Sequence, residues 1–290
     1  MPHAILPNTT TSYNDWRDGL YRDGYAIIKN AVPADRAASY VESMTQWLEK
    51  FPLGFDRNDP STWTEEHLPA HMKGGMYHGY SVSHEKFVWD ARLEPGVLDA
   101  WPHQDQDSKI RGFQCAQGII NLVGNGPEDG GLVVVRGSHK FNDEFFKTHS
   151  MEKKASWGPV PDDWHGFDDS EVAWFEDRGC KTIKVCAAAG DLIVWDSRTV
   201  HYNVLPEGKN TRAVIYACYT PAALASKEDL EKKKEIFEKR ERTTHWPHRN
   251  FWRATEILRL GKKDPYHRDR PFEEPVLNDR LLKLAGALPY

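Results

Sequence analysis

The sequence of 290 residues contains only four cysteines, Cys115, Cys180, Cys186 and Cys218. None of them forms a Cys-x-x-Cys pair, and their spacing fits neither a structural zinc site nor a disulfide framework. Three lie in apolar, strand-like runs, which is typical of small buried side chains. We therefore expect reduced thiols and a reducing compartment.

An excess of positive charge and a long apolar run are also missing. The formal net charge is -5 and the isoelectric point is about 6.2, which gives no basic field for nucleic-acid binding. No stretch approaches the roughly 18 apolar residues of a membrane span. The first residues lack the pattern of a secretory signal, and the last ones are not a peroxisomal address. The sequence thus predicts a cytoplasmic protein without a nucleic-acid or membrane partner.

Internal repeats and low-complexity segments are absent as well. The hydrophobic content of 39% and charged content of 28% are those of a globular protein. Helical spacing in residues 33–51 precedes many short strands separated by glycine-rich turns. The expected strands cover residues 24–33, 112–123, 132–135, 181–186, 192–195 and 211–219. This order predicts a mainly β fold with flanking helices, the double-stranded β-helix of jelly rolls and cupins.

We expect one domain over residues 1–290. Its parts would be N-terminal helices and loops in residues 14–100, a jelly-roll core in residues 101–225 and a helical extension in residues 226–290. Within the first part, residues 52–85 predict ordered loops and residues 85–100 a helical or mixed segment. Residues 141–180 are acidic, aromatic and without periodicity, which predicts an ordered, lid-like insert.

Two side chains in the core have the spacing of metal ligands. His103 and Asp105 stand two residues apart on an expected strand and so project to the same face. With His201 from a distant strand they would form two histidines and one carboxylate, the ligand set of non-haem Fe(II) oxygenases. Arg212 follows on the next strand, and its forked guanidinium suits the far carboxylate of an organic acid.

The ordered set of motifs resembles the phytanoyl-CoA dioxygenase-like (PhyH) family of Fe(II)/2-oxoglutarate-dependent oxygenases. The matching blocks are WPHQDQDS, NGPEDGGLVVVRGSHK, GDLIVWDSRTVHYN and TRAVIYACYTPA. The likeness is close over residues 101–225 and loose over residues 15–50.

The resemblance implies that His103, Asp105 and His201 bind and activate the iron, and that Arg212 holds the C5 carboxylate of 2-oxoglutarate. Gln114 or Gln117 would lie near this co-substrate. Dioxygen would be the second co-substrate and ascorbate a reductant. An aspartate at position 105 favours hydroxylation or desaturation over halogenation, because halide needs the vacated ligand position.

The expected reaction is oxidation of an aliphatic C–H bond in a small organic molecule, with release of succinate and CO2. Trp101 and Trp89 flank the metal strand and would line the pocket. Two alternatives stay open. Residues 95–100 join the His103-x-Asp105 strand almost directly, where members of the family usually have a longer segment. This short connection is compatible with a catalytically reduced jelly roll that only binds a metal or metabolite. A redox-inert cupin-type metalloenzyme would use the same ligands without needing Arg212.

Overall fold

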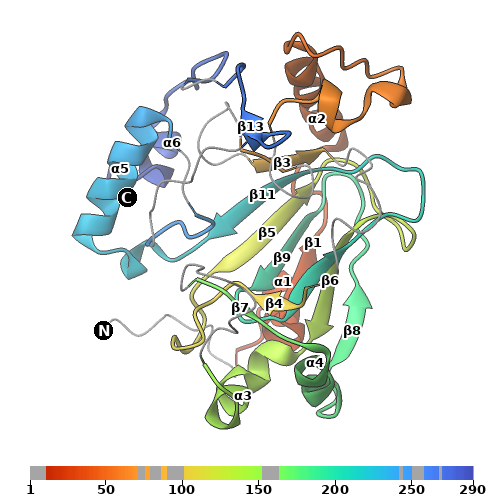
Figure 1. Cartoon of the computed structure of the whole chain (residues 1–290). Coiled ribbons are helices and arrows are strands. Elements are labelled where there is room, and N and C mark those ends of the chain that lie inside the picture. Colours follow the sequence, from red (N-terminus) through yellow and green to blue (C-terminus); the bar gives the residue numbers. More distant parts are fainter. Residues whose placement is uncertain are drawn as a thin grey trace.

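A computed structural model describes residues 11–70, 76–78, 86–89, 101–151, 163–241, 244–249, 258–267 and 270–289. Within these residues the chain forms two large antiparallel sheets (Figure 1). The first has the strand order β1-β9-β5-β11-β3-β2, and the second has the order β7-β4-β10-β6-β8. A separate hairpin pairs β12 with β13.

The strands of the first sheet are β1 (Tyr25–Ile28), β9 (Leu192–Asp196), β5 (Ala116–Asn121), β11 (Ala213–Tyr219), β3 (Lys86–Trp89) and β2 (Met76–His78). Those of the second are β7 (His165–Gly166), β4 (His103–Gln104), β10 (His201–Val204), β6 (Gly131–Arg136) and β8 (Lys181–Lys184). The hairpin strands are β12 (Leu258–Arg259) and β13 (Lys262–Lys263).

The helices are short apart from α2 and α5. They are α1 (Trp16–Asp23), α2 (Ala34–Glu49), α3 (Asn142–Thr148), α4 (Asp169–Glu176), α5 (Lys227–Lys239) and α6 (Asp279–Leu284). Single 3-10 turns occur at Pro60–Thr62, Glu65–His67, Ser138–Phe141 and Ala222–Leu224. Helix α5 begins after Ser226, whose hydroxyl accepts a hydrogen bond from the Asp229 amide, as its capping sequence predicts.

The two sheets enclose one apolar core. From β9 through β10 to β11 the chain alternates between the sheets, which is how a double-stranded β-helix is wound. Ile119 and Ile193 from the first sheet pack with Leu132 and Val134 from the second. On the outer face of the first sheet, α2 buries its apolar stripe against β11. The predicted fold class is confirmed.

The prediction for residues 85–100 was wrong where the structure describes them. Lys86–Trp89 forms β3, and its residues pair with β11 in the register Ala213↔Trp89. Strand β2, within the expected loops, extends the same sheet edge. Four residues are too few to distinguish a helix from a strand by their pattern. The segment becomes a strand because it pairs with the edge of β11. Strands β2 and β3 thereby extend the first sheet with strands that precede Trp101 in the sequence.

Residues 141–151 and 163–180 form regular elements that pack into the molecule. Phe145 of α3 and Phe175 of α4 are buried and share a cluster with Val135 and Val200 of the second sheet. Figure 1 shows both helices at the same end of this sheet, near β7 and β4. A lid role for this segment stays a prediction, but its aromatic side chains belong largely to a second core.

Candidate metal centre

Strands β4 and β10 bring the predicted metal ligands together. They pair so that His103 lies directly opposite His201. Asp105 follows β4, with one carboxylate oxygen 3.7 Å from Nε2 of His103 and the other 3.4 Å from Nε2 of His201. One ligand atom from each of the three residues lies within 4.8 Å of the other two. Among the described residues, this is the one group of histidine, cysteine and acidic side chains that could hold a metal ion.

The main chain orients both imidazole rings. Nδ1 of His103 lies 2.8 Å from the carbonyl oxygen of Trp101, and Nδ1 of His201 lies 2.9 Å from that of Thr199. A carbonyl oxygen only accepts, so each Nδ1 carries the proton. In a neutral imidazole ring the Nε2 atom then carries no proton. Its lone pair faces Asp105 and can bind a metal ion.

Burial and neighbouring charges shift the pKa values of His103 and Asp105. Burial, helped by neighbouring His201, lowers the pKa of His103 to about 4, although Asp105 opposes the change. Burial would raise the pKa of Asp105, but His245, His103 and His201 together hold it well below its usual range. A neutral imidazole and an ionised carboxylate are the forms that bind a divalent cation.

Gln117 of β5 supports the carboxylate from the opposite sheet. Its Nε2 donates a hydrogen bond of 2.7 Å to Oδ2 of Asp105, and its side chain is buried. Gln114, the other glutamine proposed for the co-substrate, instead donates to the carbonyl oxygen of Arg111 at 3.4 Å. The structure thus brings Gln117, and not Gln114, into contact with the cluster.

Trp101 covers one face of the cluster. Its ring is stacked on His103 with centroids 3.9 Å apart and an interplanar angle of 10°. Trp164, just before β7, meets Trp101 edge-on at 5.2 Å. Trp101 is 47% exposed although it is a large aromatic residue beside buried ligands. Trp89 lies in β3 opposite Ala213 of β11, and its side chain is outside the described part of the structure.

The connection between β9 and β10 positions His201. It crosses from one sheet to the other in residues 197–200, and Ser197, Thr199 and Val200 have no exposed surface. The Ser197 hydroxyl donates to Oε1 of Gln106, and the Thr199 hydroxyl donates to the carbonyl oxygen of Gly24. The amide of Val200 donates to the Ser138 hydroxyl. This crossing holds the His201 backbone from both sides.

Arg212 comes from the other sheet. It immediately precedes β11 and lies on the same face as Val214, because successive side chains of a strand alternate. Val214 belongs to the core between the sheets. The Arg212 side chain is buried, and within the described part of the chain it has no hydrogen-bond acceptor or carboxylate partner. Burial of a guanidinium is costly unless an anion or other acceptor pairs with it.

Comparison with known proteins places this geometry in a family. The family model described as phytanoyl-CoA dioxygenase (PhyH) matches residues 93–203. Ava biosynthesis cluster protein O of Aspergillus versicolor is 40% identical over 278 residues, which cover 85% of this chain and 89% of that protein. The chain belongs to the phytanoyl-CoA dioxygenase family. The resemblance read from its motifs is confirmed.

Members of the phytanoyl-CoA dioxygenase family are Fe(II)/2-oxoglutarate-dependent oxygenases, and the protein is an enzyme of this class with these cofactors. Among solved structures, a hypothetical protein from Escherichia coli has a TM-score of 0.54 and 15% identity, with 95% of this chain and 82% of that chain covered. This likeness shows a shared fold.

Sequence reasoning missed His245, which this oxygenase brings to the cluster from beyond the jelly roll. Among the groups that lower the pKa of Asp105, His245 has the largest effect. Its Nε2 is buried and has no hydrogen-bond partner in the described residues. Residues 244–249 have no helical or strand period, so no pattern could have assigned them to the site. Trp164 was missed for the same reason.

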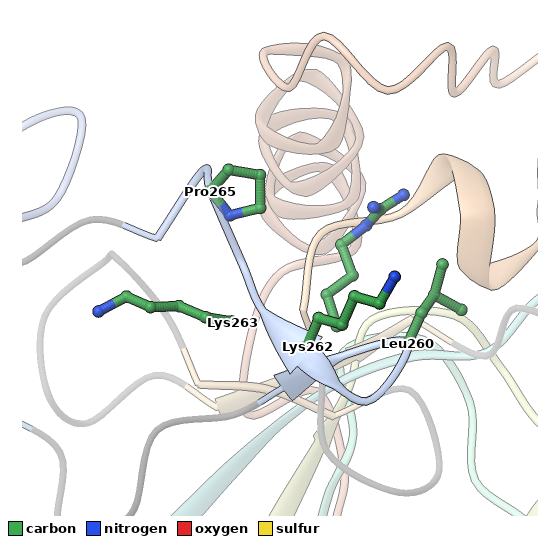
Figure 2. A pocket seen from close by; sticks show the side chains of 5 residues that line it. Leu260, Lys262, Lys263 and Pro265 are labelled. Atoms are coloured by element: carbon green, nitrogen blue, oxygen red, sulfur yellow. The ribbon is translucent and has the colours of Figure 1, made fainter.

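A surface depression of about 250 Å³ lies on the β12–β13 hairpin, lined by Arg259, Leu260, Lys262, Lys263 and Pro265 (Figure 2). The side chains in Figure 2 spread away from one another. In Figure 1 the hairpin strand β13 lies near β3, well away from β4. It is therefore separate from the metal cluster.

Among the described residues, no helix combines the length and apolar character needed to cross a bilayer.

Proposed function

We propose that this protein hydroxylates or desaturates an aliphatic C–H bond of a small organic molecule, with His103, Asp105 and His201 holding the Fe(II). The observation that carries the proposal is the convergence of two unprotonated Nε2 atoms and one carboxylate within 4.8 Å. This donor set is the facial triad of non-haem Fe(II) oxygenases, and it fits a first-row divalent metal.

The three side chains come from one sheet, so they occupy one side of the metal position and leave the other side for ligands. The bound Fe(II), with 2-oxoglutarate and dioxygen, supplies the oxidation of the C–H bond and releases succinate and CO2. The protein supplies ligation, orientation and a dry environment for this chemistry. His103 and His201 keep their orientation through their Nδ1 hydrogen bonds, and Asp105 keeps its orientation through Gln117.

Arg212 is the proposed partner of the C5 carboxylate of 2-oxoglutarate. It lies across the core from β10, on the inner face of β11, and its guanidinium has no acceptor in the described residues. A forked, always-charged donor orients a carboxylate through paired hydrogen bonds. The co-substrate would then reach from the metal in the second sheet to Arg212 in the first.

The substrate is proposed to be a biosynthetic small molecule. The name of the relative assigns that protein to a biosynthesis cluster, which favours such a substrate here. Exposed Trp101, backed by Trp164, offers an aromatic wall beside the metal position. His245 adds a polar group on the side of the C-terminal extension. An aromatic wall with few polar groups is typical of a pocket for an organic molecule.

The first experiment is an anaerobic titration of the metal-free protein with Fe(II) and then 2-oxoglutarate. We expect the weak visible charge-transfer band of the chelate, its loss in Asp105→Ala, and its appearance only at higher 2-oxoglutarate in Arg212→Ala. Succinate release coupled to substrate should fall by about 100-fold or more in His103→Ala, because the open site loses a ligand and its geometry. Asp107→Ala, two residues beyond the ligand pair, is the matched control.

Three outcomes would contradict the proposal. Metal binding without a chelate band would point to a module that only binds metal. Turnover without dioxygen or 2-oxoglutarate would point to redox-inert metal chemistry. Unchanged turnover in the His103, Asp105 and Arg212 variants would exclude the assigned residues.

A further inference from the structure

Gly131, the first residue of β6, lies next to Arg212. The opening discussed below is the space beside Gly131 that a side chain would fill. Gly131 has a φ of +136°, which is rare for any residue with a side chain. A Cβ built on it would lie 3.4 Å from each of three nitrogen atoms, Nε of Arg212, Nδ2 of Asn125 and Nζ of Lys184. All three nitrogens are hydrogen-bond donors, and two carry a positive charge. Donors that converge on one point can together hold an anion.

Lys184 lies beside Arg212, and the carboxylate of Asp129 is near enough to act on its charge. Its Nζ donates to the carbonyl oxygens of Gly130 at 3.3 Å and Val185 at 3.5 Å. Within the described chain, neither Lys184 nor Arg212 forms an ion pair. Burial lowers the pKa of Lys184, and the nearby charge of Arg212 adds to this effect. Two partly buried cations this close together repel each other unless an anion joins them.

Asn125 is oriented toward the same opening. Its Oδ1 accepts hydrogen bonds from Nδ2 of Asn121 at 2.6 Å and from the amide of Ala187 at 3.2 Å. The oxygen is thereby fixed on one side, and Nδ2 must point the other way, toward Val185 and Gly131. One of its two N–H groups donates to the Val185 carbonyl oxygen, which leaves the second for a ligand.

The opening lies at a suitable distance from the metal cluster. On β10, Val204 is opposite Gly131 and His201 is opposite Val134, so the two positions are three residues apart. At ~3.3 Å per residue the separation is about 10 Å along the strand. An extended five-carbon diacid bound to the metal at one end would bring its far carboxylate to the donors around Gly131.

We propose that Lys184 is a second cationic contact for the distal carboxylate of 2-oxoglutarate, and that Asn125 and Arg212 complete a three-donor cradle that Gly131 leaves open. This inference rests on the proposed function. The cradle makes the site selective for a 2-oxo diacid, because a 2-oxo acid without a distal carboxylate would make no contact with the buried Arg212 and the partly buried Lys184.

The test compares Lys184→Met with Lys181→Met, an exposed lysine at the other end of the same strand. The Kd of 2-oxoglutarate is measured by anaerobic titration of the Fe(II)-loaded protein, followed by the chelate band. The same titration with 2-oxobutyrate, which lacks the distal carboxylate, is the matched ligand control. We expect Lys184→Met to raise the Kd of 2-oxoglutarate about 10-fold or more, because a charge-assisted contact is lost.

The Kd of 2-oxobutyrate should stay unchanged in Lys184→Met, Lys184→Arg should recover most of the affinity for 2-oxoglutarate, and Lys181→Met should bind both acids like the wild type. An unchanged Kd of 2-oxoglutarate in Lys184→Met would overturn the inference. An equal loss for both acids would also overturn it, because it would indicate a general disturbance. Absence of the chelate band in the wild type would instead contradict the proposed function, and this inference with it.

Discussion

Single residues at the cluster are oriented in two different ways. Main-chain carbonyl groups orient both histidines, so their geometry follows from the strands themselves. Asp105 lies after β4 ends and depends on a side chain, the buried amide of Gln117. The carboxylate is therefore the ligand most easily displaced by a substitution elsewhere.

Replacing Gln117 by leucine should weaken metal binding. The variant keeps a similar volume but removes the 2.7 Å hydrogen bond that holds Oδ2 of Asp105. Loss of such a partner typically costs about 10- to 100-fold in metal affinity. The Kd of Mn(II), followed by titration of the metal-free protein, measures the effect, and Gln114→Leu serves as the control. A changed 2-oxoglutarate Kd with an unchanged metal Kd would show that Gln117 serves the co-substrate instead.

The sequence allowed His103, Asp105 and His201 to be proposed together, because His103 and Asp105 have the spacing of side chains on one face of a strand. His103 and Asp105 follow the two-residue period, and Arg212 lies where the next strand begins. No comparable signal exists for His245 or Lys184. The segment with His245 has no period, and Lys184 reads as an ordinary lysine until Gly131 and Arg212 are placed beside it.

Among the elements, turns decide how the strands meet. The turn before β9 packs against the start of α2, where the Val32 amide donates to the carbonyl oxygen of Gly190 at 2.9 Å. Gly190 has a φ of +83°, and a Cβ there would lie 2.1 Å from the Val32 carbonyl oxygen. The sequence marked this turn by its glycine, but it could not show the close approach of α2. The same limit applied to β3, whose state was set by its pairing with β11.

Gly190→Ala should destabilise the fold much more than Gly179→Ala. Gly179 has a similar φ of +85°, but a Cβ at this position would have nothing within 4 Å, so only the backbone cost of about 1–2 kcal/mol applies. Gly190→Ala adds the collision with Val32 and should cost a further ~2 kcal/mol or more. Urea unfolding of the two metal-free variants measures the difference. Equal losses of free energy would show that α2 moves aside freely.

At the scale of the whole molecule, the site joins the two sheets. His103 and His201 lie in the second sheet and Asp105 directly follows its strand β4, while Gln117 lies in the first sheet and Arg212 directly precedes its strand β11. Strand β4 has only two residues, and it is paired on both sides. Ligands that bind the cluster and Arg212 together would therefore reinforce the contact between the sheets.

Metal and 2-oxoglutarate should stabilise the protein stepwise against heat. A ligand at 100 times its Kd adds about 2.7 kcal/mol to the free energy of unfolding. For a domain of this size that corresponds to a rise in Tm of roughly 5 °C. Differential scanning calorimetry with Mn(II), then with 2-oxoglutarate, measures both steps. Asp105→Ala should lose both, and Arg212→Ala should lose the second only; a second step of full size in Arg212→Ala would speak against the bridging role.

The connection in residues 197–200 has a consequence for how this scaffold can diversify. Ser197, Thr199 and Val200 are fully buried, and their hydrogen bonds reach Gly24, Gln106 and Ser138, so a single inserted residue would displace His201. The next connection, residues 205–212, contains several exposed positions. Changes of loop length, in evolution or in laboratory redesign, are therefore confined to parts of the chain other than residues 197–200. A new substrate range must arise while this connection keeps its length.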